Sequence, residues 1–436
     1  MNNLISFLEN GRMYPFHMPG HKLNPRFLYS ELLKADITEI TGADVLCMPS
    51  GVLSDLQKRL ARNFGAGESF ILTNGSTCGV ISAVLSVCGC GDIIIAAQNA
   101  HKSFFSGVEV SGAQPVYITP DVAGYGFAGN VSPKAVEAAL AENNNAKAVF
   151  VTSPTYEGVV SDIIAISRVT REHGVVLIVD EAHGAHFAFS SYFPKTALEM
   201  GADIVVQSLH KTLPALTQTA VLHVRHGFDA MRIKRFIHML QTSSPSYMFM
   251  AQIDFMSTLL ETSSVELFNE YVNNLCRFRE RASALKSIKL IGREINTFDV
   301  DLGKLVFYYK GRGIELERCL RECGVQVEAA FKDYVIAMTS IADTTEGFDM
   351  LLNGLASADG KLKPLYENDD SVNLMQYIGK TAAGIIAPFP PGVPLVAPGE
   401  TLTKDVLNTV AELLKSGTVV LGVSKINGRY CLDVKD

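Results

Sequence analysis

Two side chains of opposite charge each follow a short apolar stretch of the chain, and together they could hold one charged ligand. Asp180 ends the apolar stretch 175–179, and Lys211 comes 31 residues later (211 − 180), behind the second stretch 203–207. A carboxylate at the end of a buried strand needs a cationic partner or several hydrogen bonds. Ligands of open α/β sheets bind at the carboxyl ends of strands, so we expect both side chains to face one ligand.

Other residues with functional side chains follow apolar stretches in the same way. The hydroxyls and the backbone N–H groups of a Gly-Ser-Thr turn that opens a helix could hold a phosphate, although an ordinary helix cap explains that turn equally well. A histidine at a strand end could likewise be structural. The residues in these positions are Gly75, Ser76, Thr77, His101, His183, Ser208 and His210.

Pyridoxal 5'-phosphate (PLP) requires the functional groups that this set offers. A lysine amine forms a Schiff base with the PLP aldehyde, and a carboxylate keeps the pyridine nitrogen protonated so that the ring accepts electrons. Each element of the set is weak evidence alone, but their shared position at strand ends makes the combination specific. The sequence therefore predicts PLP as the cofactor and no metal site.

The string Asp180-Glu-Ala-His183 also occurs in helicases that hydrolyse nucleotides, which is a rival interpretation. Such enzymes need a phosphate loop of the form Gly-x-x-x-x-Gly-Lys-Ser/Thr. The nearest match is Gly379-Lys380-Thr381, and the required earlier glycine would fall at position 374, which is leucine. The helicase interpretation is therefore rejected.

The elements that must position these residues alternate regularly along the first part of the chain. Short apolar stretches separated by helical segments predict a mostly parallel sheet with helices on both faces. We expect a three-layer α/β domain over residues 51–255. Its expected strands are 70–73, 93–97, 115–118, 148–152, 175–180, 203–207 and 219–224.

The remaining segments differ from this pattern. Residues 1–50 are irregular, residues 256–285 predict a connecting helix, and residues 286–436 predict a smaller α+β C-terminal domain. Five of the 17 prolines stand between Pro388 and Pro398. A stiff loop of this kind costs little entropy to hold in place, so it could carry a functional group or act as a rigid linker.

Composition limits the classes of function that fit. The 436 residues carry 38 Lys and Arg against 45 Asp and Glu, a net charge of −7, which argues against general nucleic-acid binding. No apolar run approaches the roughly 18–20 residues that span a bilayer, and the first residues do not resemble a signal peptide. Eight cysteines at low density predict buried free thiols in a reducing cytoplasm.

The chain resembles the Orn/Lys/Arg decarboxylase family in its short form, which lacks the N-terminal wing domain of the long enzymes. The matching motifs run in the family's order over nearly the whole chain. They are Phe16–Lys22, Asn74–Thr77, Asn99–Ser103, Asp180–Gly184, Ser208–Lys211, Thr242–Tyr247 and Pro390–Glu400. The Ser-x-His-Lys string and the first of these motifs are specific to this group.

This resemblance implies the fold-type-I architecture of PLP-dependent transferases, with a seven-stranded sheet in the large domain. It also implies a homodimer, or a small multiple of dimers, with the active site at the interface. The N-terminal segment and the Thr242–Tyr247 motif would lie near that interface, with a purely structural role as the alternative.

The resemblance also assigns roles to individual residues. Lys211 carries the Schiff base, Asp180 pairs with the pyridine nitrogen, and His101 stacks on the ring. His183 donates to the phenolic oxygen of PLP. The residues that hold the phosphate are Ser76, Thr77, Ser208 and His210.

The implied reaction is the decarboxylation of lysine, ornithine or arginine, which links the protein to polyamine metabolism. His210 or Lys211 would return a proton to the α-carbon. The distal cation of the substrate would meet Glu400, together with Asp44 or Glu157. Two alternatives remain open, namely a PLP-dependent lyase or aminotransferase for another amino acid and a non-catalytic binding protein of the same fold.

Overall fold

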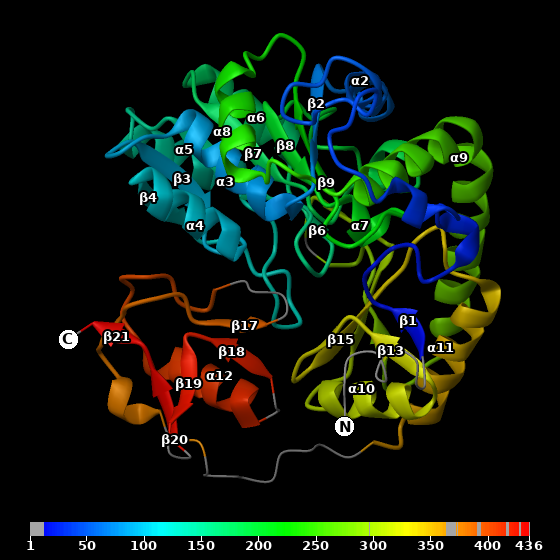
Figure 1. Ribbon diagram of the computed structural model, residues 1–436. Helices are drawn as coiled ribbons and strands as arrows, with labels where there is room; N and C mark the ends of the chain where they lie inside the picture. Colours follow the sequence, from blue (N-terminus) through cyan, green and yellow to red (C-terminus); the bar gives the residue numbers. More distant parts are fainter. Residues whose placement is uncertain are drawn as a thin grey trace.

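The computed structural model describes most of the chain, and its arrangement is shown in Figure 1. The described residues are 13–295, 297–362, 372, 374–389, 394–415, 418–426 and 429–435.

A seven-stranded sheet forms the centre of the molecule, in the order β2-β9-β8-β7-β5-β3-β4. Strand β9 runs antiparallel to both of its neighbours, whereas the other adjacent pairs are parallel. This arrangement confirms the predicted mostly parallel α/β fold. The strands are β2 (Glu68–Leu72), β3 (Ile93–Ala97), β4 (Gln114–Ile118), β5 (Ala148–Thr152), β7 (Val176–Asp180), β8 (Ile204–Gln207) and β9 (Ala220–Val224).

Helices cover both faces of this sheet, because the side chains along each apolar strand alternate between the faces. Ile94 and Phe150 pack with helices α3 (Gly75–Val87), α4 (Lys102–Ser111) and α8 (Met231–Leu240). Ile95 and Val149 pack on the opposite face, against α5 (Pro133–Glu142) and α6 (Ile163–Glu172). The strands are therefore mostly apolar, apart from the buried pair Ser69 and His223 inside β2 and β9.

Helix α9 (Tyr247–Ala282) runs along one side of the large sheet and continues to the smaller one (Figure 1). It begins earlier than the connecting helix predicted over 256–285, directly after Pro245 and its N-cap residue Ser246. Proline disfavours helical backbone in the residue before it, so a helix start just beyond it is expected.

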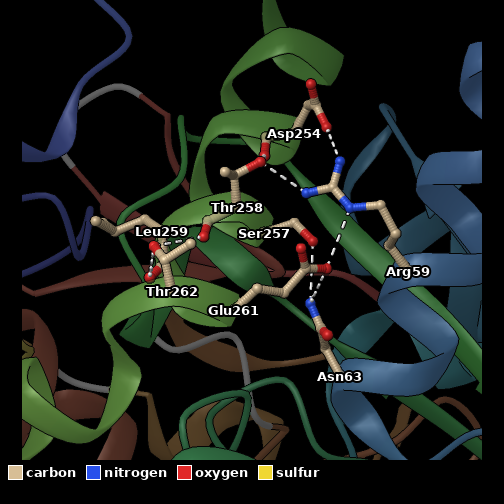
Figure 2. A network of polar contacts seen from close by, with 8 residues as sticks. All are labelled: Arg59, Asn63, Asp254, Ser257, Thr258, Leu259, Glu261 and Thr262. Carbon is tan, nitrogen blue, oxygen red and sulfur yellow. Dashed lines mark hydrogen bonds and ion pairs between the residues drawn. The ribbon is translucent and has the colours of Figure 1, made fainter.

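A polar network joins α9 to α2 (Val52–Phe64), as Figure 2 shows. The Arg59 guanidinium donates to Asp254 Oδ1 at 2.5 Å, to Thr258 Oγ1 at 2.7 Å and to Glu261 Oε1 at 3.1 Å. Asn63 donates to Glu261 and also to Ser257 Oγ at 3.0 Å. The N-terminal helix is thereby attached to the helix that leads out of the large domain.

The smaller four-stranded sheet has the order β10-β12-β15-β14 and packs with helices α10 and α11. Strand β1 pairs in parallel with β13, and β6 pairs with β11, so the N-terminal segment and the segment after β5 are both joined to this region. The elements are β1 (Tyr14–Phe16), β6 (Val159–Val160), β10 (Lys289–Leu290), β11 (Asp299–Val300), β12 (Lys304–Tyr308), α10 (Gly313–Glu322), β13 (Val325–Val327), β14 (Ala329–Ala330), β15 (Tyr334–Met338) and α11 (Thr345–Ala358). Short 3-10 turns occupy Pro25–Phe27, Leu32–Ala35 and Phe187–Phe189.

The last part of the chain has an apolar cluster of its own, built around Leu374, Leu407 and Val410. Its elements are a 3-10 turn (Met375–Tyr377), β16 (Thr381–Ala382), β17 (Ala387–Phe389), α12 (Lys404–Lys415), β18 (Val419–Leu421), β19 (Val423–Ile426), β20 (Arg429–Leu432) and β21 (Val434–Lys435). Of the predicted proline-rich loop, residues 390–393 lie outside the described residues. The predicted domain boundaries stay a prediction.

The expectation that the eight cysteines are buried is wrong for most of them. Cys78 and Cys88 are buried, whereas Cys47, Cys90 and Cys276 are exposed, as is Cys323. Cys276 is exposed although its neighbour Leu275 on α9 is buried, so apolar neighbours in the sequence do not predict the burial of a cysteine. Among the described residues, no helix combines the length and the apolar composition needed to cross a membrane.

Replacing Arg59 with alanine should lower the free energy of unfolding by about 1–2 kcal/mol, because three acceptors on α9 lose a charged donor. Urea unfolding followed by circular dichroism measures the change. Lys58→Ala is the matched control, since Lys58 pairs with Asp55 inside α2 and should cost under about 0.5 kcal/mol. Equal losses in the two variants would contradict the role given to the network.

Candidate active site

A cavity of about 370 Å³ opens where the large sheet, the N-terminal segment and the smaller sheet meet. The ends of β5 and β7, the segment after β3, the first turn of α3 and the short helix α7 (Leu209–Thr212) all contribute to it. Five predicted site residues and Glu157, which sequence analysis named as a secondary candidate, line this one cavity. They are Ser76, His101, Asp180, His183, Lys211 and Glu157.

Asp180 ends β7 and is buried, with only 4% of its surface exposed. Its Oδ1 accepts a hydrogen bond from the N–H of Ala182 at 3.1 Å. Burial raises the pKa of the carboxyl, and the nearby Lys211 ammonium opposes that shift. The site by itself compensates the negative charge of Asp180 only in part. A protonated ring nitrogen placed here would stabilise the charged form of this carboxyl.

Lys211 lies in α7, directly behind β8, and its Nζ is 3.0 Å from His183 Nε2. Burial lowers the pKa of this lysine, while the carboxylates of Asp180 and Glu328 act in the opposite direction. A lysine with a lowered pKa has a larger neutral fraction at a given pH, so its amine is a better nucleophile.

A second lysine contacts the other side of the same imidazole. Lys304 opens β12, is 2% exposed, and places its Nζ 2.7 Å from His183 Nδ1. Burial lowers the pKa of Lys304 to about 7, against the attraction of Asp301 and Glu328. Burial and the two neighbouring lysines lower the pKa of His183 well below its usual value, so the ring is neutral.

His101 is the N-cap residue of α4, and its Nδ1 lies 2.9 Å from Ser103 Oγ. Burial, followed by the charge of Lys211, lowers the pKa of His101 to about 3. The ring therefore stays uncharged at neutral pH. A neutral imidazole on the cavity wall suits face-to-face contact with an aromatic ligand.

The first turn of α3 and the residues before Lys211 meet at one end of the site. Gly75 has a φ of +74°, which favours glycine. Ser208 Oγ donates to Ser76 Oγ at 2.9 Å. Thr77, in the same turn, is exposed. Hydroxyls beside a helix N-terminus are suited to an anion such as phosphate.

His210 lies beside this turn, but its imidazole is directed to the backbone. His210 Nδ1 contacts the carbonyl oxygen of Thr219 at 2.8 Å, and His210 is absent from the described residues that line the cavity. Burial lowers the pKa of His210 to about 4. The structure therefore joins His210 to β9 rather than to the cavity.

Two half-buried acids and two buried tyrosines form the opposite wall. Tyr156 donates to Glu328 Oε1 at 2.9 Å, and Tyr334 donates to Glu157 Oε1 at 3.1 Å. The backbone N–H of Met18 donates to Glu328 Oε2 at 3.0 Å. Burial raises the pKa of Glu157, an effect opposed by its hydrogen bonds and by Lys304. This wall is therefore acidic, with partly exposed carboxylates held by buried tyrosines.

Two predicted substrate-binding acids lie elsewhere. Glu400 lines an adjoining cavity of about 430 Å³, and its Oε2 accepts from the N–H of Ala397 at 2.8 Å. The Asp44 carboxylate accepts from the backbone N–H groups of Ser50, Gly51 and Leu53 at the start of α2. These bonds lower the pKa of Asp44 to about 2 although burial opposes them, so Asp44 acts as a helix cap.

The N-terminal motif closes one side of the cavity through Met18. The N–H of Gly20 donates to the His210 carbonyl at 2.7 Å, and the Lys22 ammonium donates to the carbonyls of His17 and Met338 at 2.9 and 2.8 Å.

The motif Thr242–Tyr247 instead contributes to a separate cavity of about 540 Å³ beside α2. The structure therefore brings only the first of these motifs to the site.

Sequence reasoning missed several residues of the site. Lys304 could have been found as a lone lysine in an apolar strand, and Glu328 as an acid directly after one, but neither signal is specific. Asn99 Oδ1 and Thr152 Oγ1 are buried and have no hydrogen-bond partner among the described residues. Both residues line the cavity, and unpaired polar atoms of this kind require a ligand or water.

Two family models match the chain. One, described as Orn/Lys/Arg decarboxylase, major domain, covers residues 2–305, and the other, described as Orn/Lys/Arg decarboxylase, C-terminal domain, covers residues 356–418. These matches extend over both the large sheet and part of the last segment of the chain.

Individual relatives agree with the family models. The uncharacterized protein YaaO of Bacillus subtilis is 31% identical over 96% of this chain and 95% of its own length. An arginine decarboxylase of Halalkalibacterium halodurans is 31% identical over 93% and 91% of the two chains. The constitutive lysine decarboxylase of Escherichia coli matches the fold with a TM-score of 0.78 at 20% identity, over 94% of this chain and 76% of that one.

Replacing His101 with asparagine should make stability less sensitive to acid. The folded pKa of about 3 lies below the ordinary value of 6.5, so His101 contributes stability that is present above pH 6.5 and is lost as the pH falls toward 3. Between pH 7 and pH 4.5 the original protein should lose about 2–3 kcal/mol more than the variant.

Urea unfolding of the cofactor-free protein at the two pH values tests this. Ser103→Ala is the control, because it removes the hydroxyl beside His101 without removing a titrating group. The control should keep the acid sensitivity of the original protein, and an identical pH dependence in His101→Asn would refute the neutral state of this ring.

Proposed function

The chain belongs to the Orn/Lys/Arg decarboxylase family of PLP-dependent carboxy-lyases, and from that premise we propose that it decarboxylates a basic amino acid to the corresponding amine and CO2. The observation that carries this proposal is the convergence of Lys211, Asp180 and His101 on one cavity that also has an acidic wall.

The residues of the cavity fit PLP. Asp180 would hold the protonated pyridine nitrogen, Lys211 the aldehyde carbon, and Ser76 with Ser208 the phosphate. His101 would lie against the ring face. The unpaired Asn99 Oδ1 and Thr152 Oγ1 are the buried polar atoms that a ligand with hydrogen-bonding groups would satisfy. Gly75, Thr77 and His210 remain proposed members of the phosphate site, although Thr77 is exposed.

Bound PLP supplies an electron sink for the pair of electrons that is released when a bond at the substrate α-carbon breaks. The chain's own part is to orient the substrate, to exclude water and to return a proton to that carbon. Lys211 lines the cavity, whereas His210 is bonded to the Thr219 carbonyl. Lys211 is therefore the better candidate for the proton donor.

The acidic wall suits the distal cation of a basic amino acid. Glu157 is held in the same cavity as Lys211 by Tyr334, and a bound cation would offset the cost of its burial. Glu400 remains a second candidate, because its cavity shares Asn99, Phe127 and Leu395 with the first one. We do not propose Asp44 for this role, because its carboxylate accepts backbone N–H groups at the start of α2.

Arginine is the substrate to test first. Relatives that match more than nine-tenths of this chain are named arginine decarboxylases, from Halalkalibacterium halodurans and from Bacillus subtilis at 29% identity. Lysine and ornithine are the alternatives within the same class. An aminotransferase typically clamps the substrate carboxylate with an arginine, and no arginine occurs among the described residues that line the cavity. That observation favours CO2 loss over amino transfer.

We also propose a homodimer, or a small multiple of dimers. Leu33, Met48 and Val52 are 86%, 73% and 61% exposed in the N-terminal part of the chain. Exposed apolar side chains concentrated in one segment are typical of an interface between subunits. The predicted position of this segment at the dimer interface agrees with that exposure.

Incubation of the PLP-loaded protein with arginine, lysine and ornithine in separate reactions should release CO2 from at least one of them. Lys211→Ala should lower the rate by at least about 10³-fold, because the residue that holds the cofactor and returns the proton is lost. Stoichiometric amine must accompany the CO2. A keto acid in place of CO2 would refute the decarboxylase and support the aminotransferase alternative.

Glu157→Gln should raise KM for the accepted substrate about tenfold or more, with a smaller change in kcat, because a buried carboxylate partner of the cation is lost. Glu400→Gln is the matched comparison and should raise KM less. Steady-state kinetics on both variants decide between the two acids, and a larger KM effect in Glu400→Gln would overturn the assignment of Glu157.

A further inference from the structure

His183 stands between two lysine side chains, a contact that the proposed reaction does not explain. Its Nε2 lies 3.0 Å from Lys211 Nζ and its Nδ1 lies 2.7 Å from Lys304 Nζ. His183 and Lys304 are both buried, and the Tyr156 ring packs edge-on against His183 at a centroid distance of 5.4 Å. The side chains therefore form a continuous row, Lys211–His183–Lys304, with the imidazole in the middle.

The hydrogen-bonding capacity of these groups limits their protonation states. An ammonium has three donors and no acceptor, and a neutral imidazole has one donor and one acceptor. When both lysines are charged, one of them must direct N–H groups at the N–H of the ring. Both contacts are hydrogen bonds only when at most one of the two lysines is protonated.

Nearby charges indicate which lysine keeps the proton. Lys304 faces three carboxylates from different parts of the chain: Asp301 beside β12, Glu328 after β13, and Glu157 before β6. Lys211 faces Asp180 and Glu328. The ring itself faces Lys211, Lys304, His101 and His210. Asp180 is also the group that the cofactor would engage, which leaves Lys304 as the better compensated cation.

We propose that Lys304 is a positioning residue that acts on Lys211 through His183. Its ammonium donates to His183 Nδ1, which places the ring proton on Nε2. That N–H points at Lys211 and donates to the lone pair of the neutral amine. The row thereby holds Lys211 in the nucleophilic state, and this role rests on the proposed function of Lys211.

The same arrangement prepares His183 for the cofactor. A proton fixed on Nε2 makes this nitrogen a donor toward an oxygen in the cavity, the role that the family resemblance implies for His183. Without the Lys304 ammonium, the ring could move its proton to Nδ1. Nε2 would then accept from a protonated Lys211, so the amine would lose its nucleophilic lone pair.

The tautomer of His183 can be measured directly in the protein without its cofactor. Two-dimensional ¹H–¹⁵N NMR of ¹⁵N-histidine-labelled protein distinguishes the two neutral forms, and His183→Gln identifies the signal. We expect the Nε2–H form at pH 7. An Nδ1–H form, or a charged ring, would overturn the proposal. This measurement depends neither on PLP nor on the folding of a Lys304 variant.

The state of Lys211 is tested by reductive methylation of the same cofactor-free protein with formaldehyde and dimethylamine borane, read at the Lys211 peptide by mass spectrometry. Only the neutral amine reacts. Lys304→Met should raise the pH midpoint of this reaction by about one unit, which is about a tenfold slower reaction at pH 7. Lys304→Arg keeps the positive charge and should restore most of the original rate.

Lys22→Met is the matched control, because Lys22 is also a buried lysine but donates to the carbonyls of His17 and Met338 rather than to His183. Its Lys211 midpoint should equal that of the original protein. An unchanged midpoint in Lys304→Met would refute the proposal. If the protein failed to decarboxylate any amino acid, the NMR and methylation results would still decide the role of Lys304.

Discussion

The cost of removing charge from water at the carboxyl ends of β7 and β8 is the constraint on which the site depends. One low-dielectric space holds the side chains of Asp180, Lys211 and Lys304. Each of these charges must be matched by an opposite charge or neutralised. Burial lowers the pKa of both lysines and raises that of the aspartate. The same burial that would destabilise an ordinary core therefore produces a nucleophilic amine and a carboxylate that favours a cationic ligand.

Segments distant in sequence supply the partners that this burial requires. Strand β1 pairs with β13, which brings Met18 to Glu328 across 310 residues of chain. Lys304 lies in β12 of the smaller sheet. Its Nζ contacts the imidazole of His183, which follows β7 of the large sheet. The site therefore forms only when the N-terminal segment, the large sheet and the smaller sheet are assembled, so its chemistry depends on complete folding.

In the proposed reaction, the choice of substrate would depend on the carboxylates beside the cavity. The carboxylates of Glu157 and Glu328 accept from the hydroxyls of Tyr334 and Tyr156, and their remaining lone pairs can accept from an incoming cation. The Glu400 cavity adjoins this cavity across Asn99 and Leu395. Under the proposed function, acids in two adjoining cavities would provide a physical basis for separating basic side chains of different length and head-group shape.

The sequence by itself determined the sheet and the groups at its edge. Period and composition predicted all seven strands of the large sheet close to their observed bounds, because strands buried on both faces are predominantly apolar. Lys211, Asp180, His101, His183 and Ser76 were identified for that reason, since they follow strands whose carboxyl ends share one edge.

Tertiary structure alone decided which more distant residues join them. Lys304 lies in an apolar strand of another sheet, and Glu328 follows a short strand that is paired with the N-terminus. Local pattern cannot reveal these partners, because their position depends on how two sheets pack rather than on the spacing of residues along the chain. The same packing placed Asp44 at a helix start and Glu400 in a neighbouring cavity, which residue type and order in the sequence do not specify.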